Sequence, residues 1–306
     1  MNASRQPESV AQVREGLGRV GYLADEPAAL VSFLAQRLGK PILVEGPAGV
    51  GKTELAKALS RDTGRRLVRL QCYEGLDESK ALYEWNYRKQ LLRIQAESEG
   101  SWEEARGDIF SEEFMLTRPL LEGIASEDPV VLLIDEIDKT DQEFEAMLLE
   151  VLSDFQISIP ELGAIEARTM PIVVLTSNNS RELTEALKRR CLYLWLDYPT
   201  IERELEIVRL HTPELDDELA RRLVEVVQMV RGLDLKKPPS IAESIDWART
   251  LLLIGAGDID RETFESTISI IVKHRSDLDV VAERVAVKLG ETGDAATAGP
   301  FRKPEE

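Results

Sequence analysis

The residues with the clearest chemical meaning form a glycine-rich stretch, Leu43 to Thr53, with the sequence LVEGPAGVGKT. It ends in a segment that matches G-x-x-x-x-G-K-[ST] at every fixed position. Its glycines let the backbone curl so that successive N–H groups point inward and form a concave anion site. The Lys52 side chain can reach the β- and γ-phosphates of a nucleotide, and the Thr53 hydroxyl can hold Mg²⁺. The stretch therefore predicts a phosphate-binding loop for ATP and Mg²⁺.

The residues on either side of this loop have the pattern that such a site requires. An apolar run at 41–44 is typical of a buried strand, and residues 54–60 have helical spacing. A helix that begins near Gly51 adds its positive end to the anion site. The alternative is a glycine-rich turn without a ligand, which this strand–loop–helix context disfavours. The residues expected to contact the nucleotide are Gly46, Pro47, Ala48, Gly49, Val50, Gly51, Lys52, Thr53 and Glu54.

Two acids follow the most apolar segment of the chain, Val130 to Ile134. Continuous apolar character indicates a strand buried on both faces, as in a parallel sheet, and such sheets bind ligands beyond the carboxyl ends of their strands. We expect Asp135 to hold Mg²⁺ through its water shell and Glu136 to polarise the attacking water. The alternative is that these carboxylates only cap the following helix.

Two further polar segments are candidates for the same site. The sequence TSNN at 176–179 ends the next strand, where Asn178 can bind the attacking water or the γ-phosphate, or can be a simple turn residue. The sequence LKRRC at 187–191 places Arg190, with Arg189 as the adjacent alternative, just before a strand. Such an arginine is either a solvated helix end or, in a ring ATPase, a guanidinium that faces the nucleotide of the next subunit.

A segment upstream of the loop is a candidate for contact with the adenine base. Tyr22 and Leu23 precede a helix expected over 26–38, and in proteins with a phosphate-binding loop this segment often lies near the base. The alternative is that Tyr22 only packs the N-terminal segment onto the core.

The elements that must position these residues alternate between strands and helices as far as residue 196, which predicts an α/β fold with a parallel, helix-covered sheet. From Thr200 onward strand patterns disappear and helical spacing takes over, so we expect a separate C-terminal all-α lid domain. The expected organisation is a flexible segment at 1–20, an α/β nucleotide-binding core at 21–198, a helical lid at 199–290 and a disordered tail at 291–306.

Two interruptions of the core are expected. Residues 76–118 form an insert in which Tyr83, Trp85 and Tyr87 alternate with polar residues, and these aromatics either contact a substrate or pack the insert onto the core. Within the insert, 97–107 is expected to be a solvated loop or short helix, and 114–125 has a helical pattern. Residues 155–167 are expected to form a hairpin.

The net charge, the cysteines and the apolar runs of the chain argue against several classes of protein. A net charge of −18 argues against general nucleic-acid binding, which needs a basic surface, although a local basic groove stays open. The two cysteines, Cys72 and Cys191, offer no disulfide framework or metal-ligand spacing. The N-terminus has no apolar leader, and no apolar run reaches the ~20 residues of a membrane span, so a cytoplasmic protein is expected.

The order of these motifs resembles AAA+ ATPases, and more narrowly the MoxR family. The insert at 76–118 and the hairpin at 155–167 are similar to two inserts of that family. The phrases RLQCYEGLDE, LYEWNYRKQLL and TSNNSREL are similar to the branch that includes the accessory ATPase of aerobic carbon monoxide dehydrogenase. The resemblance covers roughly residues 21–254.

The resemblance implies a sheet of strand order 5-1-4-3-2 and an ATP-hydrolysing hexameric ring. Such a ring acts as a chaperone or maturation factor that remodels a client protein or metalloenzyme, usually with a von Willebrand factor A-domain partner. Asn178 matches the family's sensor 1 and Arg190 its arginine finger, while Lys139 matches a basic residue that can face the neighbouring subunit. The lid lacks the usual sensor-2 arginine, because the equivalent stretch is KPPSIAE at 237–243 and offers only Lys236 or Lys237. The alternatives are a nucleic-acid motor or restriction-type subunit, and a slow nucleotide switch.

Overall fold

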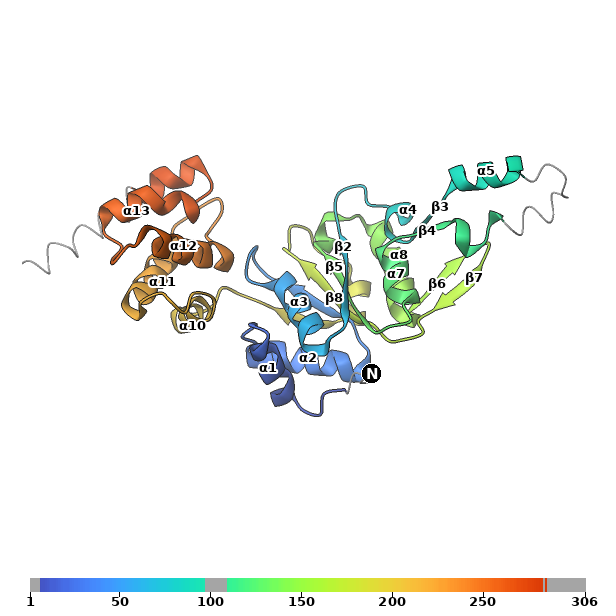
Figure 1. Ribbon diagram of the computed structural model, residues 1–306, viewed down its shortest axis with the longest axis horizontal. Helices are drawn as coiled ribbons and strands as arrows, with labels where there is room; N and C mark the ends of the chain where they lie inside the picture. Colours follow the sequence, from blue (N-terminus) through green and yellow to red (C-terminus); the bar gives the residue numbers. More distant parts are fainter. Residues whose placement is uncertain (1–5, 97–108, 283, 285–306) are drawn as a thin grey trace, which may run out of the picture. The chain divides into compact units, whose positions relative to one another are not determined.

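The computed structural model describes residues 6–96, 109–282 and 284. The chain divides into two compact units. We call residues 1–47 with 51–196 the sheet unit and residues 48–50 with 197–306 the helical unit, and describe each by itself (Figure 1).

The sheet unit is built on five parallel strands in the order β2-β5-β8-β1-β9. Numbered 1 to 5 along the chain and read from β9 to β2, these strands have the order 5-1-4-3-2. The predicted fold class and strand order are therefore confirmed. Every residue of β5 and β8 is buried, because helices cover both faces of the sheet. The strands are β1 (Ile42–Glu45), β2 (Arg66–Gln71), β5 (Val130–Asp135), β8 (Ile172–Ser177) and β9 (Leu192–Trp195).

Helices form a layer on each face of this sheet (Figure 1). On one face α2 (Glu26–Leu38) packs on β1 and β9, and α3 (Lys52–Thr63) packs on β2, β5 and β8. The other face is covered by α7 (Pro119–Ala125), α8 (Gln142–Asp154) and α9 (Glu185–Arg190).

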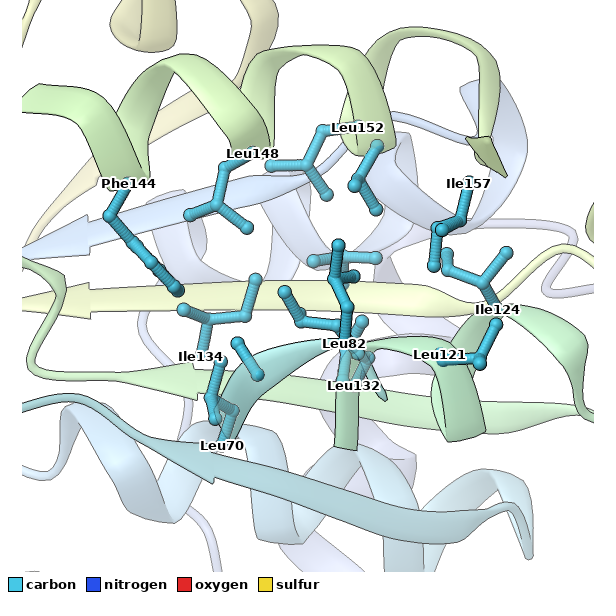
Figure 2. Packing of buried hydrophobic residues seen from close by; sticks show 14 of the residues in the cluster. Leu70, Leu82, Leu121, Ile124, Leu132, Ile134, Phe144, Leu148, Leu152 and Ile157 are labelled. Atoms are coloured by element: carbon cyan, nitrogen blue, oxygen red, sulfur yellow. The ribbon is translucent and has the colours of Figure 1, made fainter. Parts of the chain in front are cut away.

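The core beneath α8 follows from its apolar residues at every fourth position. Phe144, Leu148 and Leu152 share one face of the helix and point toward the sheet, where Leu132 and Ile134 of β5 meet them (Figure 2). Asp141 caps the helix by accepting a hydrogen bond from the Phe144 amide at 2.8 Å. This packing fixes β5, and with it the two acids that follow.

The N-terminal segment differs from the prediction. Residues 1–20 were expected to be flexible, but α1 (Val10–Arg19) packs on α2 and α3, and its Val13 and Leu17 are buried. The spacing of these two apolar residues is helical, and the Ser9 hydroxyl caps the helix by accepting from the Gln12 amide at 3.2 Å. The flexible-segment prediction is therefore wrong for this helix, because a short polar helix needs only one narrow apolar stripe to dock.

The insert contains a small antiparallel ribbon. Strand β3 (Tyr83–Trp85) pairs with β4 (Met115–Thr117), so the helical pattern predicted from residue 114 is wrong until α7 begins. The remaining elements of the insert are α4 (Glu78–Ala81), α5 (Tyr87–Ala96) and the 3₁₀ turn η1 (Glu112–Phe114). The solvated segment predicted at 97–107 lies outside the described residues.

The aromatic residues of the insert divide into two kinds. Trp85 is 8% exposed and meets the ring of Phe110 edge-on at 5.3 Å and that of Tyr83 at 6.0 Å. Tyr87, at the start of α5, is 63% exposed. Packing therefore accounts for Tyr83 and Trp85, whereas Tyr87 is available at the surface.

Residues 156–166 form an antiparallel hairpin between β6 (Gln156–Ile159) and β7 (Gly163–Glu166). Ile157 and Ile159 point into the core below α8, and the hairpin is thereby tied to the sheet unit.

The helical unit contains α10 (Ile201–His211), α11 (Asp217–Arg231), α12 (Ile241–Ile254), α13 (Arg261–Thr267) and the 3₁₀ turn η3 (Ile268–Ile270). Its centre holds a buried ion pair, in which Glu204 accepts from Arg231 at 2.5 and 2.7 Å and from the Ser244 hydroxyl at 2.7 Å. These bonds tie α10, α11 and α12 together, because an unpaired carboxylate at this depth would be costly. The tail predicted at 291–306 lies outside the described residues.

The position of Leu132 at the centre of β5 makes a prediction about stability. Leu132 is fully buried against α7 and α8, so Leu132→Ala should lower the free energy of unfolding by about 3 kcal/mol in urea denaturation. Leu38→Ala is the matched control, since that leucine is 59% exposed at the end of α2 and its truncation should change little. Equal effects of the two substitutions would contradict this view of the core.

Candidate active site

The glycine-rich loop leaves the end of β1 and enters α3 at Lys52. Gly46 has φ 150° and Gly51 has φ 97°, in the region that favours glycine. A Cβ atom on Gly46 would lie 1.9 Å from the carbonyl oxygen of Leu196, so only glycine fits against the end of β9. The loop therefore passes close to the end of β9 and reaches the first turn of α3 as bare backbone.

The Lys52 ammonium lies inside this cradle. Its Nζ donates to the carbonyl oxygens of Gly46 at 2.7 Å and Pro47 at 2.6 Å, and the residue is 6% exposed. Burial lowers the pKa of Lys52, while the nearby Asp138 and Asp135 oppose that shift by favouring its charged form. A buried cation that donates to two neutral carbonyls is suited to bind phosphate oxygens.

The Asp135 carboxylate lies at the end of β5 and is almost completely buried. Its Oδ1 accepts from the hydroxyls of Thr53 at 2.9 Å and Thr176 at 2.5 Å. Its Oδ2 accepts from the Arg69 guanidinium, from Nε at 3.1 Å and from an Nη at 2.5 Å. The structure thus brings together Thr53 and Asp135, the two residues predicted to hold Mg²⁺.

Glu136 has left-handed backbone angles, with φ 59° and ψ 49°, which are uncommon for a residue with a side chain. Its amide donates to the Thr176 hydroxyl at 2.9 Å, which holds the turn in place. Its carboxylate accepts hydrogen bonds from the side-chain amide of Gln71 at 2.9 Å and from the Lys139 ammonium. The turn therefore directs the two consecutive acids to different sets of partners.

The loop after β8, which carries Asn178, is fixed by a carboxylate on each side. Asp138 accepts from the Ser180 amide at 3.0 Å and the Ser180 hydroxyl at 2.5 Å. Burial raises the pKa of Asp138, but the hydrogen bonds from Ser180 and from the Asn178 backbone outweigh it and leave that pKa below its ordinary value. Glu145, fully buried on α8, pairs with Arg181 at 2.6 Å. Asn178 thus lies on a hydrogen-bonded loop that follows β8, the strand next to the one that ends in Asp135.

The remaining predicted site residues take different positions. Tyr22 lies beside the loop, since a Cβ on Gly51 would meet its ring at 3.9 Å, and Leu23 next to it is half-buried. Arg190 is exposed on α9, where it donates to the Ser153 hydroxyl at 2.6 Å and to the Ala186 carbonyl at 3.1 Å. Neither of these bonds reaches the phosphate-binding loop of the same chain.

The site offers oxygen donors that suit Mg²⁺. A hydroxyl and a carboxylate are hard ligands, and Mg²⁺ usually keeps several waters and binds through one or two carboxylates plus substrate phosphates. Within the described residues no group of three or more His, Cys, Asp or Glu side chains is arranged to hold a metal by itself. The thiols are not candidates either, because burial raises the pKa of both Cys72 and Cys191 to about 12.

Four residues of this site were missed by the sequence analysis: Arg69, Gln71, Asp138 and Thr176. Arg69 and Gln71 occupy alternate positions of β2 beside β5, so polar residues with a period of two were the available signal. Thr176 belongs to a fully buried strand, where a hydroxyl next to two acids needs a partner.

A backbone phosphate cradle, a buried lysine and paired acids on a parallel sheet of this order define a P-loop nucleotide hydrolase. The chain belongs to the AAA family, described as the ATPase family associated with various cellular activities, whose pattern matches residues 42–194. The protein is accordingly an ATPase.

Two relatives among characterised proteins are consistent with this assignment. The chain is 23% identical to the gas vesicle ATPase GvpN1 of Halobacterium salinarum over 244 residues, which cover 75% of this chain and 69% of that protein. It is 23% identical to the protein NorQ of Paracoccus denitrificans over 244 residues, or 78% of each chain. These relatives agree with the MoxR-like resemblance.

Among solved structures, RuvB of Thermotoga maritima matches with a TM-score of 0.49 and 18% identity, over 87% of this chain and 73% of that one.

None of the described helices has both the length and the apolar character needed to cross a lipid bilayer.

Proposed function

We propose that the protein uses ATP hydrolysis to remodel a client protein or metalloenzyme, as a MoxR-like chaperone or maturation factor working with a von Willebrand factor A-domain partner. The observation that carries this proposal is the insert between β2 and α7, which exposes apolar side chains on a helix outside the sheet. On α5, Tyr87 is 63%, Leu91 59% and Leu92 67% exposed, and such surfaces mark protein interaction sites. The net charge of −18 disfavours nucleic acid as the partner.

The site geometry supports the following roles in hydrolysis. We assign phosphate binding to the loop amides and Lys52, and metal binding to Thr53 and Asp135. Mg²⁺ supplies charge neutralisation between the β- and γ-phosphates when it is bound. Glu136 is the group that orients and polarises the attacking water, and Asn178 presents an amide to the same region. Tyr22 and Leu23 are assigned to the adenine.

Arg190 is assigned to a neighbouring subunit's nucleotide in a hexameric ring. It is exposed, and its guanidinium is oriented by Ser153 of α8 and the Ala186 carbonyl of α9. An exposed but oriented guanidinium suits a site completed by a second copy, because a planar charge acts there only if its direction is set.

ATPase assays with different partners test the proposed function. Turnover should rise when a von Willebrand factor A-domain protein encoded by a neighbouring gene is added, and should not respond to single-stranded or duplex DNA. Strong stimulation by DNA alone would replace this proposal with a nucleic-acid motor.

The role of Glu136 is tested by Glu136→Gln, which keeps the side-chain shape and removes the charge. The variant should bind ATP with near-normal affinity while turnover falls by at least about 100-fold, the usual contribution of a general base. Nucleotide binding by fluorescence and phosphate release would be measured on the same preparation. A variant that hydrolyses ATP normally would remove Glu136 from this role.

The proposed action of Arg190 across a subunit boundary is tested by mixing variants. Arg190→Ala alone should lose about 1,000-fold in turnover, since an arginine finger contributes that much or more. Mixed with Glu136→Gln subunits, it should regain partial activity, because some interfaces then combine an intact Glu136 with an intact Arg190. Arg189→Ala is the matched control, since Arg189 is the adjacent alternative; it should keep its turnover if Arg190 is the residue that acts. If assembly is intact and no mixture regains activity, the site is not shared between subunits.

A further inference from the structure

We propose that Arg69 is a positioning residue for the metal: its guanidinium holds the Asp135 carboxylate until Mg²⁺ binds, and hydrated Mg²⁺ then takes its place. This inference rests on the Mg²⁺ site proposed above. Arg69 lies on β2, the edge strand next to β5, and it begins the phrase RLQCYEGLDE, to which the sequence alone gave no role in the site.

The Asp135 carboxylate has no lone-pair site left for a further hydrogen-bond donor. An ionised carboxylate has about four lone-pair sites on its two oxygens. In Asp135 the Thr53 and Thr176 hydroxyls use Oδ1, and two nitrogens of Arg69 use Oδ2. All of these sites are therefore filled. Water molecules on a Mg²⁺ ion can reach Asp135 only if one of its present donors leaves.

The three side chains that donate to Asp135 differ in how easily they can leave it. Thr176 is 1% exposed, and its hydroxyl also accepts a hydrogen bond from the Glu136 backbone amide. Moving Thr176 would therefore break the turn that carries both acids. Thr53 is itself expected to contact the metal and remains beside Asp135. The Arg69 side chain, by contrast, is 47% exposed, and water can solvate its guanidinium as it leaves. Arg69 is thus the donor that is least costly to displace.

The displaced guanidinium has a second partner close by, and the metal replaces its charge at Asp135. An Nη of Arg69 also donates to the Gln71 side chain at 2.5 Å, so a second partner on the same strand keeps it near the site. A buried carboxylate without a cation is unfavourable, and Asp135 keeps one in both states: arginine first, then the metal. The pair therefore keeps Asp135 oriented before Mg²⁺ arrives.

The test is a Mg²⁺ titration of nucleotide binding to the full chain, with a fluorescent, non-hydrolysable ATP analogue. Arg69→Met removes the competing cation but keeps most of the side-chain volume. The free Mg²⁺ concentration at half-saturation should fall about tenfold, in line with the loss of a charge-assisted hydrogen bond. In EDTA the same variant should bind the analogue more weakly than the wild type, because Asp135 then repels the phosphates.

Arg66→Met is the matched control, since Arg66 lies on the same strand and pairs with Glu122 at the surface. It should leave both constants unchanged. An Arg69→Met protein with the wild-type Mg²⁺ requirement would overturn the exchange, and so would equal shifts in the two variants. A loss of affinity in Arg69→Met both with and without Mg²⁺ would show a purely structural role and would also overturn it. If the wild type itself binds nucleotide equally well with and without Mg²⁺, the metal site fails, and this role for Arg69 fails with it.

Discussion

The burial of one negative charge governs the arrangement of this protein. Asp135 lies at the end of a strand covered on both faces, where an ionised carboxylate needs several partners to be tolerated. Those partners come from three different elements: a threonine at the start of α3, an arginine on β2 and a threonine on β8. The need to satisfy this carboxylate therefore aligns the loop helix with three neighbouring strands.

The strand order makes that convergence possible. In the sequence β2-β5-β8-β1-β9, the strand carrying the acids lies between β2 and β8, and the loop leaves β1 one strand further along. All five strands are parallel, so their carboxyl ends meet at one edge of the sheet. Residues separated by more than a hundred positions, such as Arg69 and Thr176, thereby share one hydrogen-bonded group.

How much could be predicted from the sequence depends on the range of the interactions involved. The loop glycines and Lys52 could be identified because they form a motif of adjacent residues. Val130–Ile134 could be identified because a strand buried on both faces is a continuous apolar run. Arg69 and Thr176 were missed because their meaning depends on which strands are neighbours. The helix α1 and the strand β4 were missed because each is decided by docking onto distant residues rather than by a strong local pattern.

The two thiols have a practical consequence for studying motion in this protein. Cys72 is buried, and both cysteines have a pKa of about 12, so almost none of either is in the reactive thiolate form near neutral pH. The wild-type chain is therefore a ready background for single introduced cysteines. Spectroscopic probes attached at chosen surface positions could follow the working cycle without first removing the native ones.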